Sequence, residues 1–136
     1  MNTKFLTLIL FVLPLVSFIS LQKTKDTCEQ FRTGKFLFRL DPPGRDISFI
    51  IERNDSIQTE TEKTSGKYTK LSIKWVEPCI YEAKMIETTF NFPDSVQRIR
   101  RTVPLRTKIL SWTKDYYLFE TSRGDYIMKD TMWILK

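Results

Sequence analysis

Two pairs of carboxylates are the residues of this chain best spaced for acid–base chemistry. Asp41 and Asp46 flank a short proline-containing segment, and Glu60 and Glu62 would share a face if they lie on a strand. Paired carboxylates act as acid and base in glycosidases. However, Glu60 and Glu62 lie in a run of Thr and Lys that is typical of a solvated segment.

The sequence contains no histidine. This removes the usual general base, the Ser-His-Asp and Cys-His arrangements, and the commonest ligand of zinc and copper. We therefore predict no catalytic residue, no metal site and no cofactor, and expect a protein that is not an enzyme. An enzyme that uses carboxylates alone is the alternative, and it would need two acidic side chains converging in one cleft.

A basic cluster is the second group with chemical potential. It comprises Arg98, Arg100, Arg101, Arg106 and Lys108, in a chain whose net charge is +6. Such a cluster can attract phosphate-bearing headgroups or polysaccharide. It is equally typical of a solvated loop and of an edge strand protected from pairing with other chains. We nominate its four arginines as candidate contacts for an anionic group.

Cys28 and Cys79 are the two cysteines of the chain. An even count in an exported protein predicts one disulfide. It would close a loop of about fifty residues, and the chain-entropy model assigns such a loop about 4 kcal/mol of stabilisation. Neither the C-x-x-C spacing of redox sites nor a set of metal-ligand residues accompanies these cysteines. A structural staple is the expected role.

The N-terminus predicts where the protein works. Lys4 precedes the apolar run 5–19, and the small residues Ser17 and Ser20 follow, so residues 1–20 are predicted to be a signal peptide. An uncleaved membrane anchor is the alternative, because the run is only just shorter than the roughly 20 residues that span a bilayer. We expect export to the periplasm, the cell surface or the medium. Contact with the membrane is expected only through this segment, if it is not cleaved.

The remaining residues, 21–136, are predicted to form a single antiparallel β-domain. Apolar and polar residues alternate between turn signals, as is typical of half-buried strands. The expected strands are 34–40, 47–53, 57–63, 70–75, 79–89, 103–112, 116–121 and 126–135. One helical turn is expected from about Asp94. About eight short strands without a long amphipathic helix predict a small barrel or sandwich, with a lipocalin-like meander as the favoured form.

Large aromatic residues are expected on the inner faces of these strands. They are Phe36, Phe38, Trp75, Tyr81, Trp112, Phe119 and Trp133. Such residues can line a cavity for an apolar ligand, or they can simply fill the core. We nominate Phe36, Phe38, Trp75 and Tyr81 as candidate ligand contacts.

Three segments carry a resemblance to a known group. They are 28–36 (CEQFRTGKF), 53–60 (RNDSIQTE) and 73–81 (IKWVEPCIY). Together they resemble a family of small exported proteins of flavobacteria and other Bacteroidota. The family has no established function. Its members often carry the automated label DNA topoisomerase IV, although 116 residues (136 less 20) cannot hold a topoisomerase's catalytic machinery. The resemblance implies an exported, disulfide-bonded β-protein and leaves the activity open.

Two functions fit these features. The first is a non-enzymatic binding protein that holds an apolar or lipid-like ligand within the barrel. The second is an envelope interaction module with a filled core, which docks a protein or glycan partner. We expect no nucleic-acid partner, because export separates the protein from nucleic acid and no recognised reading motif is present. The two functions differ in whether the barrel is hollow.

Overall fold

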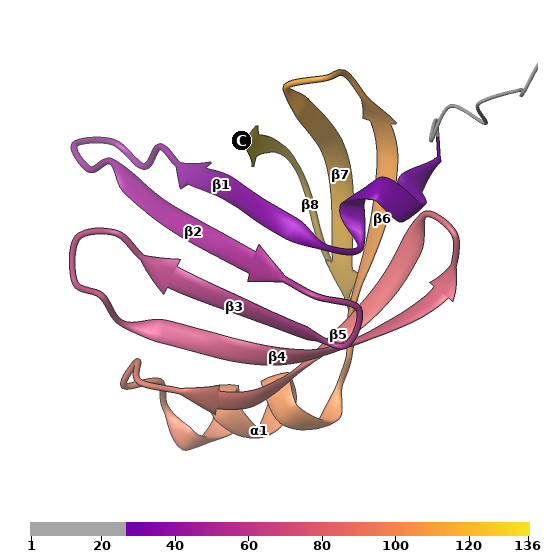
Figure 1. The fold of residues 1–136 in the computed structure, drawn as a ribbon. Coiled ribbons are helices and arrows are strands. Elements are labelled where there is room, and N and C mark those ends of the chain that lie inside the picture. The colour runs from indigo at the N-terminus through magenta and orange to yellow at the C-terminus, as the bar shows by residue number, and fades with distance from the viewer. Residues whose placement is uncertain (1–26) are drawn as a thin grey trace, which may run out of the picture.

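The computed structural model describes residues 27–136, so the predicted signal peptide at 1–20 lies outside the described residues. The described part is a closed barrel of eight antiparallel strands (Figure 1). Each strand pairs with its neighbour in sequence, and β8 closes the barrel by pairing with β1. This confirms the predicted all-β meander, and it decides for a barrel over a sandwich.

The elements lie close to their predicted positions. In chain order they are η1 (Cys28–Phe31), β1 (Gly34–Leu40), β2 (Ile47–Arg53), β3 (Ile57–Glu62), β4 (Tyr68–Glu77), β5 (Ile80–Thr88), α1 (Asp94–Thr102), β6 (Leu105–Trp112), β7 (Tyr116–Arg123) and β8 (Tyr126–Leu135). The short helix η1 was not predicted. The single helical turn expected from Asp94 is a nine-residue helix, α1.

The strands form because their residues alternate between core and solvent. In β4, Thr69, Leu71 and Ile73 are buried, whereas the residues between them are partly exposed. Side chains two residues apart share a face of a strand, so each strand gives every second side chain to the interior. This alternation fixes the pairing register, because a slip of one residue would move the apolar set into solvent.

A bulge in β6 changes which side chains point inward. The β6–β7 register shifts between Ile109 and Ser111, so that Ile109 pairs with Phe119 and Trp112 pairs with Tyr117. Ile109 and Trp112 therefore both belong to the inner face, although they are three residues apart. Trp112 lies edge-on to Phe31, with ring centroids 5.9 Å apart. The predicted inner position of Trp112 is thus confirmed.

The predicted inner position of Trp133 is wrong. Trp133 is 40% exposed and pairs with Leu37 and Tyr116, whose neighbours in sequence face the interior. Its ring lies 5.2 Å from that of Tyr116 on the outside of the barrel. In β8 the buried residue is Met132, so the inner face carries the even-numbered positions. The presence of an aromatic side chain did not reveal which face of this strand points inward.

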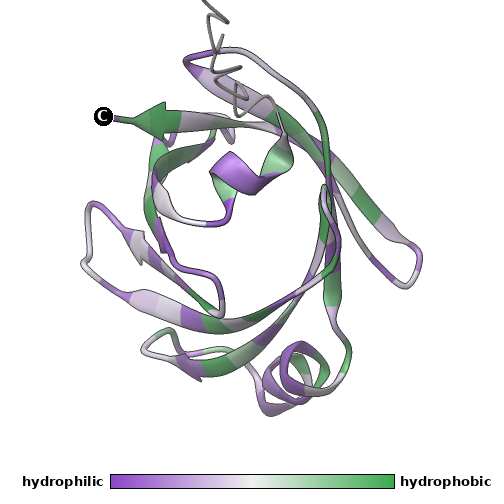
Figure 2. Cartoon of the chain, turned by 45° about the vertical axis from the view of Figure 1, so that its right-hand side comes forward, coloured by the Kyte–Doolittle hydropathy of each residue, from purple (hydrophilic) through white to green (hydrophobic). Residues whose placement is uncertain are grey.

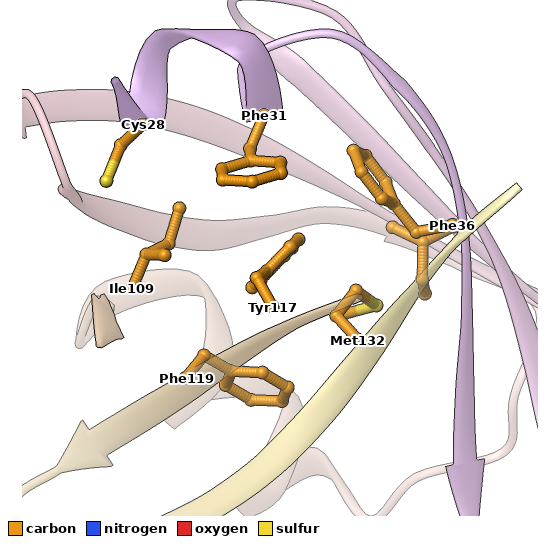
Figure 3. Close-up of a cluster of buried hydrophobic side chains, with 8 residues drawn as sticks. Cys28, Phe31, Phe36, Ile109, Tyr117, Phe119 and Met132 are labelled. Carbon is orange, nitrogen blue, oxygen red and sulfur yellow. The ribbon is translucent and has the colours of Figure 1, made fainter. Parts of the chain in front are cut away.

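Helix η1 closes one end of the barrel. Seen along the barrel, it lies within the ring of strands, whereas α1 lies outside the ring (Figure 2). The Cys28–Cys79 disulfide joins η1 to the turn between β4 and β5, which confirms the predicted pairing. Figure 3 shows Phe31 of η1 facing Tyr117, with Phe36 and Met132 beside them. Phe31 and Tyr117 are almost completely buried, and their ring centroids are 4.7 Å apart. We call this region the closed end.

Candidate functional site

A cavity of about 500 Å³ occupies the other part of the barrel interior. Apolar side chains from most of the strands make up much of its wall: Phe38, Ile51, Leu71, Ala83, Leu105, Phe119, Met128 and Met132. Its polar and charged lining includes Gln58, Glu60, Tyr81, Arg100, Thr107, Thr121, Arg123 and Tyr126. Binding sites for small molecules are typically cavities of about 300–1,000 Å³ with mainly apolar walls and a few polar groups. We call this cavity, with its lining, the open half.

The meander explains why one barrel has these two parts. β1 starts at Gly34, beside η1, so the odd-numbered strands start at the closed end and the even-numbered strands finish there. Arg123 ends β7 and Tyr126 begins β8, so both lie at the opposite end from η1. Arg100 reaches the cavity from α1, which follows β5 and packs against it. The two open-half arginines therefore come from a strand end and from the helix α1, which lies outside the barrel wall.

Arg53 is the central polar contact of the closed end. It is 5% exposed, and its guanidinium donates hydrogen bonds to four acceptors. Nε reaches Gln58 Oε1 at 2.6 Å and Nη1 reaches the carbonyl oxygen of Phe31 at 2.9 Å. Nη2 reaches the hydroxyls of Tyr81 and Tyr117, each at 3.1 Å. A buried guanidinium remains charged, so it is tolerated only where its N–H groups are satisfied.

The ring of Tyr81 completes the surroundings of Arg53. The guanidinium carbon lies 4.7 Å from the centroid of Tyr81 and 5.1 Å from that of Phe36. Both distances are within the range of cation–π attraction. Because Arg53 also holds the carbonyl of Phe31, it ties the closing helix η1 to β2, β5 and β7.

Glu60 is the carboxylate of the cavity wall. Its Oε1 accepts a hydrogen bond of 2.7 Å from Nε2 of Gln58, whose other end accepts the bond from Arg53. Burial raises the pKa of Glu60, and the Gln58 hydrogen bond and the charges of Arg100, Arg53 and Arg123 oppose that rise without cancelling it. The expectation that Glu60 is solvated is wrong, because this side chain faces the cavity.

Two of the four nominated ligand contacts line the cavity. They are Phe38 and Tyr81. Phe36 is buried in the closed end, where its ring lies edge-on to Tyr117 at 5.7 Å. Trp75 packs beside Tyr81 at 4.9 Å, and the guanidinium of Arg32 lies over its ring at 5.1 Å. Of the four nominated residues, Phe38 thus belongs to the open half, Phe36 to the closed end, and Tyr81 lies between the two, with Trp75 packed against it.

The four nominated arginines are not brought together. Only Arg100 belongs to the cavity wall. Arg98 is exposed, and Arg101 donates a 2.5 Å hydrogen bond to the carbonyl oxygen of Ile86. Arg106 forms ion pairs with Glu82 at 3.3 Å and with Glu77 at 4.0 Å on the outer surface. Their close spacing in the sequence did not reveal that the fold directs these side chains to different sides of the molecule.

The carboxylate pairs nominated for catalysis do not converge. Asp41 and Asp46 lie in the exposed connection between β1 and β2, where Asp46 accepts a hydrogen bond from Ser48. Glu62 accepts a hydrogen bond from Ser65 in the turn after β3. Glu60 is thus the one carboxylate that lines the cavity of the described barrel. Residues 27–136 contain no group of three or more potential metal-ligating side chains.

Arg53 and Arg123 were not predicted as site residues, although the alternation of their strands indicates that both face inward. Arg53 follows Phe49 and Ile51 at two-residue spacing, and Arg123 follows Phe119 and Thr121 in the same way. Each arginine ends an inward-facing series. Because charged residues are rarely buried, they are easily taken for the start of a turn. In both strands the series of inward-facing residues extends to the last residue.

Within residues 27–136, no helix combines the length and the apolar character needed to cross a membrane. Comparisons of the chain with protein-family models, with curated proteins and with solved structures find no match.

Proposed function

We propose that this protein is an exported, non-enzymatic binding protein that holds an apolar or lipid-like ligand inside its barrel. The observation that carries the proposal is the cavity of about 500 Å³, with an apolar wall and few charged groups. Eight-stranded barrels have interiors wide enough to hold one small ligand. The disulfide is consistent with an oxidising compartment, and this supports the exported location.

The makeup of the cavity favours binding over catalysis. Acid–base catalysis by carboxylates alone would use two of them, and Glu60 is the one that faces this cavity. The other charged groups of the wall are arginines, which stay protonated and are poor proton carriers. A cavity with permanent charge and an apolar wall is suited to holding a ligand without changing it.

Native mass spectrometry tests the proposal. The protein is purified without detergent from a Bacteroidota host, the group whose exported proteins its sequence resembles. We expect a co-purifying mass in the range of single-chain lipids, released when the protein is unfolded. The apo protein should then bind the neutral fluorescent probe N-phenylnaphthylamine, and a lipid extract should displace it. An apo mass together with no binding of this probe or of its anionic relative, anilinonaphthalene sulfonate, would overturn the proposal.

An outer apolar face favours the second candidate function, docking of an envelope protein or glycan. Leu118 and Trp133 are each about two-fifths exposed on β7 and β8, and Tyr116 packs against Trp133. Leu110, in the β6 bulge, is exposed beside them. Aromatic side chains are enriched at protein interfaces. This face lies outside the barrel, so docking there and ligand binding inside are compatible.

A further inference from the structure

The lining of the cavity carries more positive than negative charge. Its charged groups are Arg100, Arg123 and Glu60, and the buried Arg53 lies beneath it. Charges removed from water are costly unless they are paired. The distribution of partners among these four groups therefore indicates what the cavity lacks.

Glu60 is already engaged with Arg53 through Gln58. Gln58 donates to Glu60 at 2.7 Å and accepts from Arg53 at 2.6 Å, so its amide connects the carboxylate to the buried guanidinium. The other partners of Arg53 are a carbonyl and two hydroxyls, which carry no charge. Glu60 is thus connected to Arg53 by this hydrogen-bonded chain, and its single negative charge is shared among Arg100, Arg53 and Arg123.

Arg100 and Arg123 have no such partner. In the part of the chain that the structure describes, neither forms an ion pair, and Nε of Arg123 is buried without a hydrogen bond. The guanidinium carbon of Arg100 lies 4.4 Å from the ring centroid of Phe92, a contact that provides no anion for its charge. Burial and the charge of Arg100 both lower the pKa of Arg123. The charge of Glu60 raises it by a smaller amount. Two arginines thus face the cavity together with one carboxylate, Glu60, which forms an ion pair with neither of them.

We infer that the ligand is an amphiphile with an acidic headgroup, held by Arg100 and Arg123, and with its apolar chain against Phe38, Phe119 and Met132. This inference rests on the proposed function and names its ligand class. An ionised carboxylate, phosphate or sulfonate supplies the missing charge. A guanidinium binds such groups through charge-assisted, often bidentate hydrogen bonds. A neutral lipid of the same shape would leave both arginines unpaired.

A pair of dyes isolates the charge. Anilinonaphthalene sulfonate and N-phenylnaphthylamine share one aromatic skeleton, and only the first carries an anion. We expect the wild-type protein to bind the sulfonate at least about tenfold more tightly, since a hydrogen bond to a charged group contributes enough for such a factor. Equal affinities, or a preference for the neutral dye, would overturn the inference while leaving the proposed function intact. This comparison does not depend on any variant.

Substitutions then locate the headgroup. Arg100→Gln and Arg123→Gln should each weaken sulfonate binding about tenfold and leave binding of the neutral dye within about twofold. Arg39→Gln is the matched control, because Arg39 lies on the outer face of β1 and its loss changes the net charge equally. An equal loss in the Arg39 variant would contradict a local site. Arg123→Lys, which keeps the charge, should recover part of the lost affinity.

Displacement distinguishes the sources of the headgroup. Dodecanoate, dodecyl phosphate and dodecanol are each titrated against the bound sulfonate dye. Displacement by the two acids and not by the alcohol supports an acidic amphiphile. Whichever of the two acids displaces the dye at the lower concentration identifies the ligand as a free fatty acid or as a phosphate-bearing lipid. If dodecanol competes as well as the acids, the inference fails. If neither dye binds the wild-type protein, the proposed function fails with it.

Discussion

The closed end and the open half are built from the same eight strands, yet one is filled and the other is hollow. At the closed end, the rings of Phe31 and Tyr117 pack against each other, and Arg53 donates its hydrogen bonds to neighbouring elements. In the open half, Ala83, Thr107 and Thr121 occupy inward positions with small side chains, and two arginines have no ion-pair partner among the described residues. The strand pattern is the same in both parts, so the helix η1, side-chain size and charge pairing distinguish them.

This difference indicates that the closed end serves stability and the open half serves binding. A packed and covalently joined end stabilises the barrel, whereas unpaired charge and empty volume generally reduce stability. Sites that bind ligands commonly carry such a cost. Changes at the closed end should therefore affect mainly the free energy of unfolding, and changes in the open half should affect mainly binding.

Removal of the disulfide should have the largest effect on stability. The Cys28–Cys79 bond spans a separation of 51 residues, for which the chain-entropy model predicts a loss of about 4 kcal/mol. We expect the Cys28→Ala/Cys79→Ala protein to show that loss in urea denaturation, and reduced wild-type protein to match it. If neither treatment lowers the free energy of unfolding, the closed end is not held by its covalent link.

Replacement of the buried guanidinium should come next. Arg53→Met keeps a long unbranched side chain but leaves Gln58, Tyr81, Tyr117 and the Phe31 carbonyl without their donor. We expect a loss of about 3 kcal/mol, measured by urea denaturation. Burial raises the pKa of Tyr117, so its hydroxyl stays neutral and serves as an acceptor at physiological pH.

Two variants refine the interpretation of Arg53. Tyr117→Phe removes one of the acceptors and should cost about 1.5 kcal/mol. Arg39→Met makes the same replacement on the outer face, where a change of no more than about 0.5 kcal/mol is expected. If Arg53→Met is as stable as the wild type, apolar packing replaces the polar contact without loss, and Arg53 does not organise the closed end.

Filling the cavity should change binding more than stability. Ala83 is a small residue of the cavity wall, so Ala83→Leu places three additional carbon atoms toward the empty space. Because these atoms occupy part of the cavity, the free energy of binding should become less favourable by about 1–3 kcal/mol. This corresponds to a loss of about tenfold or more in N-phenylnaphthylamine affinity. Fluorescence titration measures this loss, and thermal unfolding should show little change.

A buried residue that does not line the cavity provides the contrast. Ile73 is buried in β4 beside Ala83, its partner in β5. Ile73→Val should lower stability by about 0.5–1.5 kcal/mol and leave dye affinity unchanged. If both variants alter affinity equally, the cavity does not bind the dye.

The sequence predicted the architecture well because alternation and turn residues are local. The strands from Gly34 to Leu40 and from Ile47 to Arg53 were placed to the residue, since Pro42, Pro43 and Gly44 separate them. The Cys28–Cys79 pairing followed from having two cysteines. Only one of the two proposed headgroup arginines was predicted, because Arg100 and Arg123 lie on a helix and at a strand end that the fold brings to the same cavity. Trp133 was misplaced because its strand carries apolar residues on both faces.

Neutralising Glu60 should give the smallest and most informative effect. Burial raises its pKa above the ordinary value of 4.5, so its ionisation costs the folded state more than the unfolded state. Below about pH 4 both states hold the proton, and the wild type and Glu60→Gln should have similar stability. As the pH rises through the raised pKa, the wild type should lose stability relative to the variant. Urea denaturation over this range measures the difference.

The same variant connects the two parts of the barrel. Glutamine at position 60 can still accept the hydrogen bond from Gln58, so the closed end should keep its contacts, while the cavity loses its negative charge. Sulfonate dye should then bind more tightly at pH 7, whereas the neutral dye should not. Glu52→Gln, which removes an outer-face carboxylate paired with Lys35 at 2.9 Å, is the control for net charge. If Glu60→Gln is instead less stable than the wild type at pH 7, attraction to the arginines outweighs burial. Glu60 would then be the counter-ion that Arg100 and Arg123 already possess, and the separation between a self-sufficient closed end and an unpaired open half would not hold.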